Sequence, residues 1–362
     1  MKILSIETSC DDTSVAVVEC NGDINNLKVS ILSNLVSSQT QIHKKYGGIV
    51  PNLAARAHTK NMLPVLELAL KKAGITHSNF LKEIDLITTT IGPGLSPSLL
   101  IGSNFAKNLS WLLDKPIVGV NHLNGHIYSN LLNLQTKDFH IDIQYPAVSL
   151  LVSGGHTQLY LLKNLTDIKL IGETRDDASG ECFDKIAKLL NLGYPGGPII
   201  SKVADEYKQK HINDKIIFDL PRPLIHSHDY DFSFAGLKTA VLYLIEKLKK
   251  QKKYNKLTKQ QICFESQNAI CECLVSKTIK LAIEKNAKSI MVSGGVSANK
   301  ELRNKLQQEI KNQNLDMKFY CPEFSLSADN ASMIAIAGYI KYLTKGADDP
   351  VEMDIDPNLK IN

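Results

Sequence analysis

The sequence predicts an α/β protein built from two like-folded halves. Two strand–turn–strand patterns, at 2–19 and 147–163, join runs rich in Ile, Val and Leu through short polar or small-residue turns, as is typical of β-hairpins. Each hairpin is followed by helical patterns and then by a further apolar strand, at 85–91 and at 289–293. A chain of 362 residues also exceeds the size at which a single core keeps growing. We therefore expect two domains whose hairpin turns face a shared cleft.

The connecting segments show apolar residues at helical spacing. Helices are expected at 54–73, 98–113, 181–191, 233–250, 260–285, 297–311 and 329–344. Prolines and glycines crowd the segment 192–230, which we expect to be mostly irregular. The acidic tail after Gly346 is expected to be loose.

The composition favours a soluble, cytoplasmic protein with no membrane association. Acidic side chains at 7, 11 and 12 interrupt any signal-peptide pattern, and glycines and prolines interrupt the uncharged stretch 86–106. Seven cysteines without a Cys-x-x-Cys pair fit a reducing compartment. The net charge of +5 and the lysines at 247–259 permit a nucleic-acid partner, with a solvated helix end as the alternative.

A possible metal site begins with His122 and His126, whose four-residue spacing stacks both imidazoles on one face of a helix. Protease helices of the His-Glu-x-x-His type carry a general base beside the first His, where this chain has Leu123. Two helix-surface histidines are the alternative. Taken by itself Asp329 is an N-cap candidate, but beside the histidine pair it is the best-placed distant carboxylate for a third ligand. Two His and one Asp would leave open positions for substrate oxygens.

Two glycine turns suit the binding of an anion. Ser153-Gly154-Gly155 separates two apolar strands, and glycines let backbone N–H groups approach a phosphate, although a tight hairpin is the alternative. Gly294-Gly295 leads from a strand into a helix, where a nucleotide can lie against the helix N-terminus. Asn299 can then bind the ligand or cap that helix.

A third glycine turn, which contains Gly197, follows the helix that carries Asp184. Its prolines fix the turn and its glycines remove side chains, which suits the edge of a sugar or base pocket. Asp184 can hold ribose hydroxyls or pair with Lys188 on the helix surface.

Ten segments in order along the chain resemble the TsaD family of tRNA threonylcarbamoyltransferases, once labelled O-sialoglycoprotein endopeptidases. The segments are IETSCD at 6–11, YGGIVP at 46–51, GPGL at 92–95, HLNGH at 122–126, LVSGGHTQ at 151–158, FDK at 183–185, YPGGP at 194–198, DFSFAGLKT at 231–239, SGGVSAN at 293–299 and DN at 329–330. They span nearly the whole chain.

The resemblance implies an actin-, Hsp70- and sugar-kinase-like fold, with two ribonuclease-H-like domains and a nucleotide cleft. It implies a first domain at 1–127 completed by a helix at 329–346, a second at 128–328 and a tail at 347–362. The implied reaction moves the threonylcarbamoyl group of threonylcarbamoyl-AMP to N6 of adenosine 37, in tRNAs that read codons beginning with A, and releases AMP. The implied partners are tRNA, a TsaB-like paralogue and a TsaE-like ATPase.

The family's functional residues follow by motif position. His122, His126 and Asp329 would hold one divalent metal, described for the family as iron, and this ligand set also suits zinc or manganese. Asp11 is our candidate for positioning the amine or relaying its proton. The adenylate would be bound by Leu151, Val152, Ser153, Gly154, Gly155, Asp184, Gly197 and Asn299.

The chain departs from the family pattern at three places. Asp12 replaces the usual Glu, Ala331 replaces a frequent Gly, and the tail lacks the Arg and Trp often found near the family's end. Two other functions stay open: an ATP-binding conformational switch or scaffold of the same fold, and a metal-dependent glycoprotease. The lack of a Glu beside His122 weighs against the protease.

Overall fold

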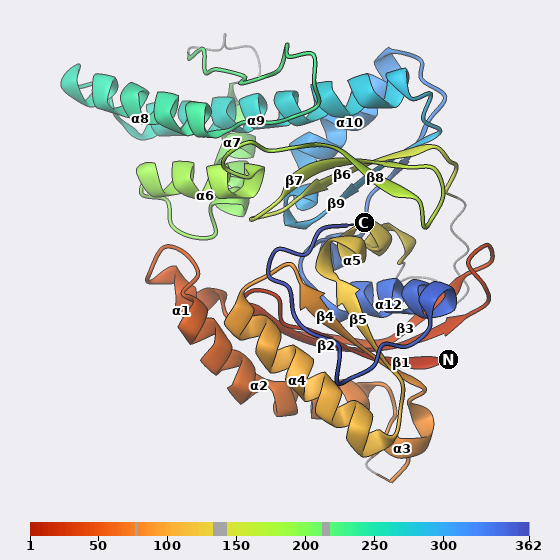
Figure 1. Cartoon of the computed structure of the whole chain (residues 1–362). Helices are drawn as coiled ribbons and strands as arrows, with labels where there is room; N and C mark the ends of the chain where they lie inside the picture. Colours follow the sequence, from red (N-terminus) through yellow and green to blue (C-terminus); the bar gives the residue numbers. More distant parts are fainter. Residues whose placement is uncertain (77, 133–142, 212–217, 362) are drawn as a thin grey trace. The chain divides into compact units, whose positions relative to one another are not determined.

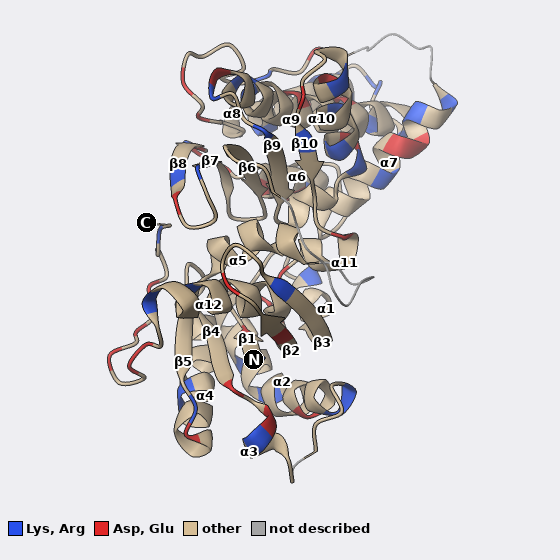
Figure 2. Ribbon diagram, turned by 90° about the vertical axis from the view of Figure 1, so that its right-hand side faces the viewer, with Lys and Arg blue, Asp and Glu red and all other residues tan. Residues whose placement is uncertain are grey.

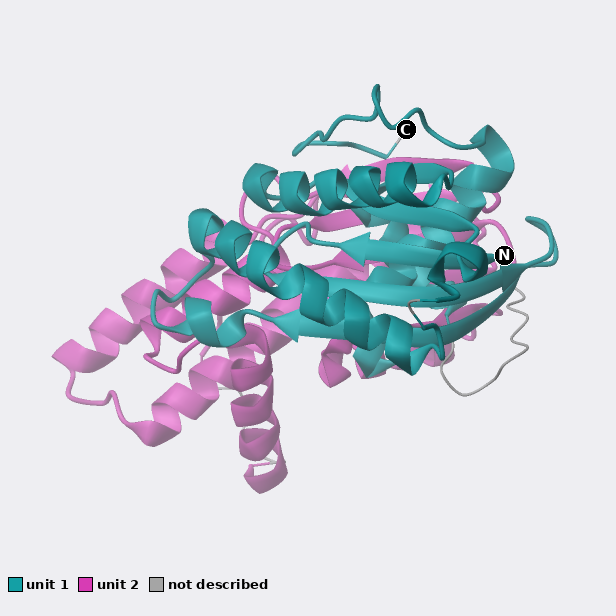
Figure 3. Ribbon diagram, turned by 90° about the horizontal axis from the view of Figure 1, so that it is seen from below, with its two compact units in different colours: residues 1–142, 322–362 teal, residues 143–321 magenta. Residues whose placement is uncertain are grey.

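The computed structural model contains two compact units, coloured separately in Figure 3. It describes residues 1–76, 78–132, 143–211 and 218–361. Unit 1 comprises 1–142 and 322–362, and unit 2 comprises 143–321. The expected domain boundaries at 127/128 and 328/329 both lie inside unit 1.

Unit 1 is built on a five-stranded sheet of order β3-β2-β1-β4-β5. β1 pairs antiparallel with β2 and parallel with β4, and β4 pairs parallel with β5. The elements are β1 (Lys2–Glu7), β2 (Asp12–Asn21), β3 (Lys28–Ser38), α1 (Thr40–Lys44), α2 (Pro51–Lys72), α3 (Phe80–Glu83), β4 (Leu86–Gly92), α4 (Ser96–Leu113), β5 (Ile117–Asn121), α5 (His122–Tyr128), the 3-10 turn η1 (Ser129–Leu131), α11 (Phe324–Ser327) and α12 (Ala331–Lys345).

Helices cover both faces of this sheet (Figure 1). Leu4 and Val15 point toward α2 and α4, with which they form one apolar core. On the other face α12 contacts all five strands and α5. Gly338 allows this close packing, because a Cβ there would lie 2.3 Å from Thr88 Cγ2. The last helix is therefore an integral layer of unit 1.

Unit 2 repeats the same topology. Its sheet order is β10-β9-β6-β7-β8, with β6 antiparallel to β7 and parallel to β9. Its elements are β6 (Ala147–Val152), β7 (Thr157–Leu162), β8 (Ile168–Glu173), α6 (Ser179–Leu189), α7 (Gly196–Lys210), α8 (Ala235–Lys250), α9 (Lys256–Glu284), β9 (Ser289–Ser293), the 3-10 turn η2 (Gly295–Ala298), α10 (Lys300–Asn312) and β10 (Lys318–Tyr320). Read from β8, the order matches that of unit 1 read from β3, so the predicted pair of like-folded halves is confirmed.

Charge is mixed on the outer helices of unit 2. Lys247, Lys249 and Lys250 occupy the last turn of α8, where cations interact favourably with the helix dipole. Basic and acidic residues alternate along α7 (Figure 2). Within the described residues, no helix is both long and apolar enough to cross a membrane.

Two segments expected to be irregular or loose are more ordered than that expectation. The stretch 192–230 contains the 15-residue helix α7, whose prolines and glycines lie at its start, where a missing N–H costs no helical hydrogen bond. The tail is not loose either. Met353 is only 6% exposed in the core of unit 1, and Asp348 N donates to Ile117 O at 2.8 Å.

Candidate metal centre

The parallel strands of unit 1 bring three segments to one sheet edge. Glu7 ends β1, Thr90 lies near the end of β4, and His122 follows β5 directly. Because carboxyl ends of parallel strands meet at the same edge, these residues become neighbours. Asn121 caps the following helix α5, since its side-chain oxygen accepts a hydrogen bond from Leu123 N at 2.9 Å. The cap fixes where α5 begins and how His122 enters the site.

The two histidines and the distant aspartate converge. Oδ1 of Asp329 lies 3.1 Å from Nε2 of His126 and 3.5 Å from Nε2 of His122. The rings are edge to face, with centroids 4.6 Å apart. One candidate ligand atom from each of the three residues lies within 4.8 Å of the others.

Asp329 does not cap helix α12, although the sequence also allowed that role. The N-cap of α12 is Asn330, whose side-chain oxygen accepts a hydrogen bond from Met333 N at 3.1 Å. Asn330 is fully buried, whereas the Asp329 side chain is 24% exposed and directed at the histidines. Asn330 therefore starts the helix, and its neighbour Asp329 faces the imidazoles.

Gly125 brings α5 close to the start of α12. A Cβ at this position would lie 2.8 Å from Ile334 Cδ1 and 3.1 Å from Met333 Cγ, closer than carbon atoms normally pack. The glycine between the two histidines therefore allows α5 to approach the helix that Asp329 precedes.

Sequence inspection missed an outer partner of the site, Glu7. Its Oε2 lies 3.1 Å from His122 Nδ1 and also accepts a hydrogen bond from Thr90 Oγ1. Its Oε1 accepts from Ser9 N at 2.5 Å. A carboxylate on one imidazole nitrogen directs the lone pair of the other nitrogen outward, an arrangement common behind metal ligands. The available signal was an acidic residue at the carboxyl end of β1, a strand of the same sheet as β5, with β4 between the two.

Charges in the site couple strongly. Burial disfavours a charged His122, but the nearby carboxylates of Glu7 and Asp329 outweigh burial and raise the pKa of His122 to about 9. Burial lowers the pKa of His126. Burial and then repulsion from Asp329 raise the pKa of Asp11, and the same causes raise the pKa of Asp12 to about 7. The Asp329 carboxylate therefore acts on all four of these groups.

The donor set fits a divalent metal. Within the described part of the chain, neither nitrogen of the buried His126 ring makes a hydrogen bond, although one lies 3.1 Å from the Asp329 carboxylate. A buried imidazole without a hydrogen-bond partner is costly unless another ligand satisfies it. Two imidazoles and one carboxylate suit iron, zinc or manganese and leave coordination positions open.

Unit 2 carries the candidate nucleotide-binding turns. Ser153 closes the β6–β7 turn by accepting from His156 N at 3.1 Å, and the neighbouring Gly154 and Gly155 are exposed. Neither glycine has a positive φ, and none of the described atoms lies within 4 Å of a Cβ built there. Packing and backbone conformation therefore leave both positions open to a side chain.

Two contacts bring further segments beside this turn. Gly294, at φ +85°, packs against Val152 O, and Gly180 N donates to Ser153 O at 3.2 Å. Asn299 is the N-cap of α10, because its side-chain oxygen accepts a hydrogen bond from Leu302 N at 3.1 Å. This is the capping role that the sequence allowed beside ligand binding.

The remaining expected ligand residues lie around α6 and α7. Asp184 accepts a hydrogen bond from Gly196 N at 2.6 Å and so orders the first turn of α7. A Cβ at Gly197 would be 4.0 Å from the nearest atom, Phe183 Cβ, so this glycine is not crowded.

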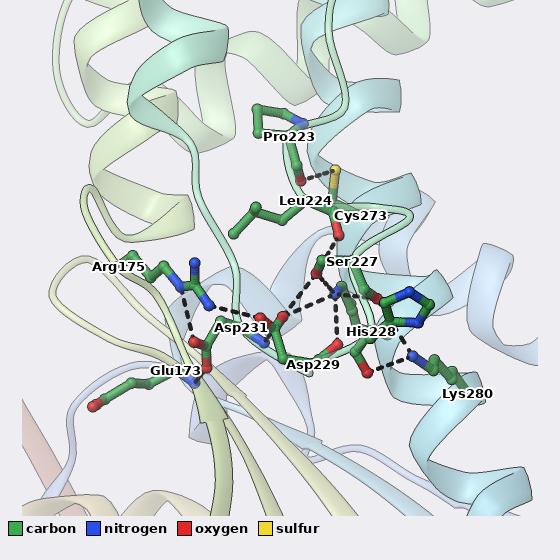
Figure 4. Close-up of polar contacts among 11 residues, drawn as sticks. Glu173, Arg175, Pro223, Leu224, Ser227, His228, Asp229, Asp231, Cys273 and Lys280 are labelled. Atoms are coloured by element: carbon green, nitrogen blue, oxygen red, sulfur yellow. Dashed lines mark hydrogen bonds and ion pairs between the residues drawn. The ribbon is translucent and has the colours of Figure 1, made fainter.

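The Asp231 motif has a structural role in unit 2 (Figure 4). Arg175 forms ion pairs with Asp231 at 2.9 Å and with Asp229 at 2.6 Å. The buried Lys277 donates to Ser227 Oγ at 2.6 Å and to Asp229 O at 2.7 Å. This network holds the irregular segment before α8 against β8 and α9.

The fold and the convergent ligand set define a protein of the actin-, Hsp70- and sugar-kinase-like class with a candidate metal centre. Among solved structures, full-length HypF in its phosphate- and nucleotide-bound form aligns over 96% of this chain and 47% of HypF, with a TM-score of 0.54 and 11% identity. That likeness concerns the fold alone.

Sequence comparison is more specific. The profile of the TsaD family, tRNA N6-adenosine threonylcarbamoyltransferase, matches residues 30–336. The tRNA N6-adenosine threonylcarbamoyltransferase of Thermosipho africanus is 44% identical over 361 residues, covering 100% of both chains. The protein of that name from Ralstonia pickettii is 43% identical, covering 94% of this chain and 91% of its own. The chain belongs to the TsaD family.

Proposed function

We propose that this chain transfers the threonylcarbamoyl group of threonylcarbamoyl-AMP to N6 of adenosine 37, in tRNAs that read codons beginning with A. The observation that carries the proposal is the convergence of His122, His126 and Asp329 in a chain similar over its full length to named tRNA threonylcarbamoyltransferases.

The reaction needs an activated donor because an exocyclic amine is a poor nucleophile. The N6 nitrogen attacks the carbamoyl carbon, a new C–N bond forms, and the C–O bond to the AMP phosphate breaks. AMP departs with the bonding electrons, and N6 loses one proton. Asp11, which lies in the β1–β2 turn of unit 1 and has a raised pKa, is our candidate for orienting the amine or accepting that proton.

His122, His126 and Asp329 would hold one divalent metal, with iron as the first candidate and zinc or manganese as alternatives. When bound, a metal with open positions supplies Lewis acidity to a carbonyl oxygen. Glu7 orients the His122 ring, and Gly125 sets the spacing between α5 and α12.

Residues of unit 2 would bind the adenylate. Open glycines at 154, 155 and 197 support this assignment, because they leave backbone N–H groups accessible to a phosphate. Asp184 would contact the ribose, and Asn299 would contact the ligand from the start of α10. The phosphate side would be lined by the end of β6 and the turn that follows it, with the residues Leu151, Val152, Ser153, Gly154 and Gly155.

The proposed partners are tRNA, a TsaB-like paralogue and a TsaE-like ATPase. A tRNA substrate and seven free cysteines support a cytoplasmic location.

Reconstitution tests the proposal. The purified chain is combined with threonylcarbamoyl-AMP, candidate TsaB- and TsaE-like partners and unmodified tRNA, and nucleosides are then analysed by mass spectrometry. We expect threonylcarbamoyladenosine with the wild type and none with His122→Ala, whose circular dichroism stays that of the wild type. Normal modification by His122→Ala would overturn the metal's role in transfer.

The same preparation separates the alternatives. Nucleotide-driven domain movement without transfer, in the presence of all partners, would favour the switch or scaffold. Metal-dependent cleavage of a glycoprotein by the pure chain would favour the protease.

A further inference from the structure

The segment after α12 covers the free edge of the unit 1 sheet. β5 is the edge strand, and Asp348 N bonds to Ile117 O at its start. The Asp348 carboxylate accepts hydrogen bonds from Gly119 N at 2.8 Å and from Lys341 Nζ at 2.6 Å. An edge strand covered in this way is protected from pairing with another chain.

The segment then crosses to the end of β4. Met353 is buried, and its Sδ lies 2.9 Å from a Cβ built on Gly119. Asp356 N donates to Ile91 O at 2.8 Å, and Pro357 O accepts from Gly94 N at 3.1 Å. Figure 1 shows this dark blue trace passing β5 toward α5.

Close backbone approach at Gly92 marks the crossing. Gly92 has φ +152°, and a Cβ there would lie 1.8 Å from Asp356 O. No other residue type fits without displacing the segment.

Near its end the segment contacts Asn121, the N-cap residue of α5. Asn121 Nδ2 donates to Leu359 O at 3.4 Å, while its Oδ1 caps α5. The turn at 92–95, whose Gly94 N donates to Pro357 O, also contacts Ser9: Leu95 N donates to Ser9 O at 2.8 Å. Ser9 Oγ is 3.2 Å from His122 Nδ1. Two routes therefore link the segment to His122.

We propose that residues 348–359, which we name the strap, are positioning residues of the metal centre. This inference rests on the proposed metal centre and adds residues far from its ligands. The strap fixes Asn121 and the Gly92–Leu95 turn, and these in turn hold His122 at the angle that its partners require. Loss of such outer support typically weakens metal binding 10- to 100-fold.

Two variants isolate the contact. Asn121→Ser keeps a neutral N-cap acceptor but loses the donor to Leu359 O. Deletion of 355–362 removes the bonds to Ile91, Gly94 and Asn121 and keeps Asp348 and Met353 on the sheet edge. Val351→Ser is the matched control in the same segment, because Val351 is 75% exposed.

Co²⁺ serves as the probe, with affinity read from its visible absorption, and hydrogen exchange of amides 123–128 is followed in metal-free protein. We expect both variants to weaken Co²⁺ binding about tenfold or more and to speed exchange in α5, with exchange in α9 unchanged. The combined variant should lose little beyond the effect of the deletion alone, because the deletion already removes the bond between Asn121 and Leu359.

Wild-type Co²⁺ affinity and wild-type exchange in both variants would overturn the strap's role. If the wild type itself binds no Co²⁺, the proposed metal centre fails. The strap is then judged by exchange alone: faster exchange in α5 supports it, and unchanged exchange overturns it.

Discussion

Glu7 and His122 form a buried pair, with Glu7 Oε2 3.1 Å from His122 Nδ1 and neither side chain more than 8% exposed. They come from the ends of two strands that do not pair with each other, because β4 lies between β1 and β5. The carboxylate fixes which nitrogen of the ring faces Asp329 and holds the pKa of His122 near 9 in the absence of metal.

Replacing Glu7 with Gln should lower the pKa of His122, because the charge that stabilises the imidazolium is removed. In the wild type a metal must displace a proton from His122 below about pH 9, so affinity should rise with pH up to that value. In the variant this rise should end at lower pH, and the plateau affinity should be about 10- to 100-fold weaker. NMR titration of the imidazoles and Co²⁺ binding measure both effects. Glu19→Gln, on β2, is the control; equal pKa values for His122 in the wild type and Glu7→Gln would contradict the pairing.

Gly125→Ala should weaken metal binding without unfolding the chain. The added methyl would meet Ile334 and Met333, whose side-chain ends must shift and move α5 away from the start of α12. Co²⁺ titration and thermal unfolding check this. Gly236→Ala is the matched helical control, because its nearest contact would be 3.7 Å away, and it should stabilise unit 2 by up to about 1 kcal/mol. Unchanged Co²⁺ affinity in Gly125→Ala would show that the spacing of α5 and α12 does not matter.

Asp12→Asn should stabilise the metal-free protein more at high pH than at low pH. The pKa of Asp12 is raised to about 7 in the fold, so the folded state binds more protons than the unfolded state between about pH 4 and 7. Stability contributed by the neutral carboxyl is therefore lost as pH rises through that window, and Asn removes this loss.

The stability difference between Asp12→Asn and the wild type should grow by on the order of 1–2 kcal/mol from pH 5.5 to pH 8. Urea unfolding with a chelator present measures it, with the exposed Asp316→Asn as control. A difference independent of pH would contradict the raised pKa.

Lys277→Met should destabilise unit 2 by about 1–3 kcal/mol, because Ser227 Oγ and Asp229 O lose a buried donor. Lys280→Met removes a more exposed donor from the same helix and should cost less than about 1 kcal/mol. Chemical unfolding gives both values. Co²⁺ affinity should stay unchanged in both variants, since the ligands belong to unit 1; weakened Co²⁺ binding would disprove this independence.

The sequence predicted the elements with strong apolar patterns. The two hairpins, β4 and β9 consist largely of buried apolar residues, and the helix α4 buries residues at helical spacing. The repeated order of these elements indicated two like-folded halves. The strands β3 and β8 escaped notice because they are half-exposed edge strands with mixed polar residues. The helix α7 was hidden by prolines and glycines that its first turn tolerates.

The three candidate metal ligands could be selected from the sequence, but the residues that position them could not. His122 and His126 have a local spacing, and Asp329 lies in a recognisable motif. Glu7 contacts His122 only because the order of the strands brings their ends together, and Gly125 matters only where α5 packs against α12. The strap contacts the sheet through backbone groups, which leave no periodic pattern in the sequence. Such roles depend on which segments become neighbours, and local sequence does not encode this.

The proposed ligands of unit 1 lie on both sides of unit 2 along the chain, with about 200 residues between His126 and Asp329. During translation, both imidazoles leave the ribosome long before the carboxylate is made. Unit 2 is continuous and can fold in the meantime. Assembly of the proposed metal centre therefore becomes one of the last events in the maturation of the nascent chain.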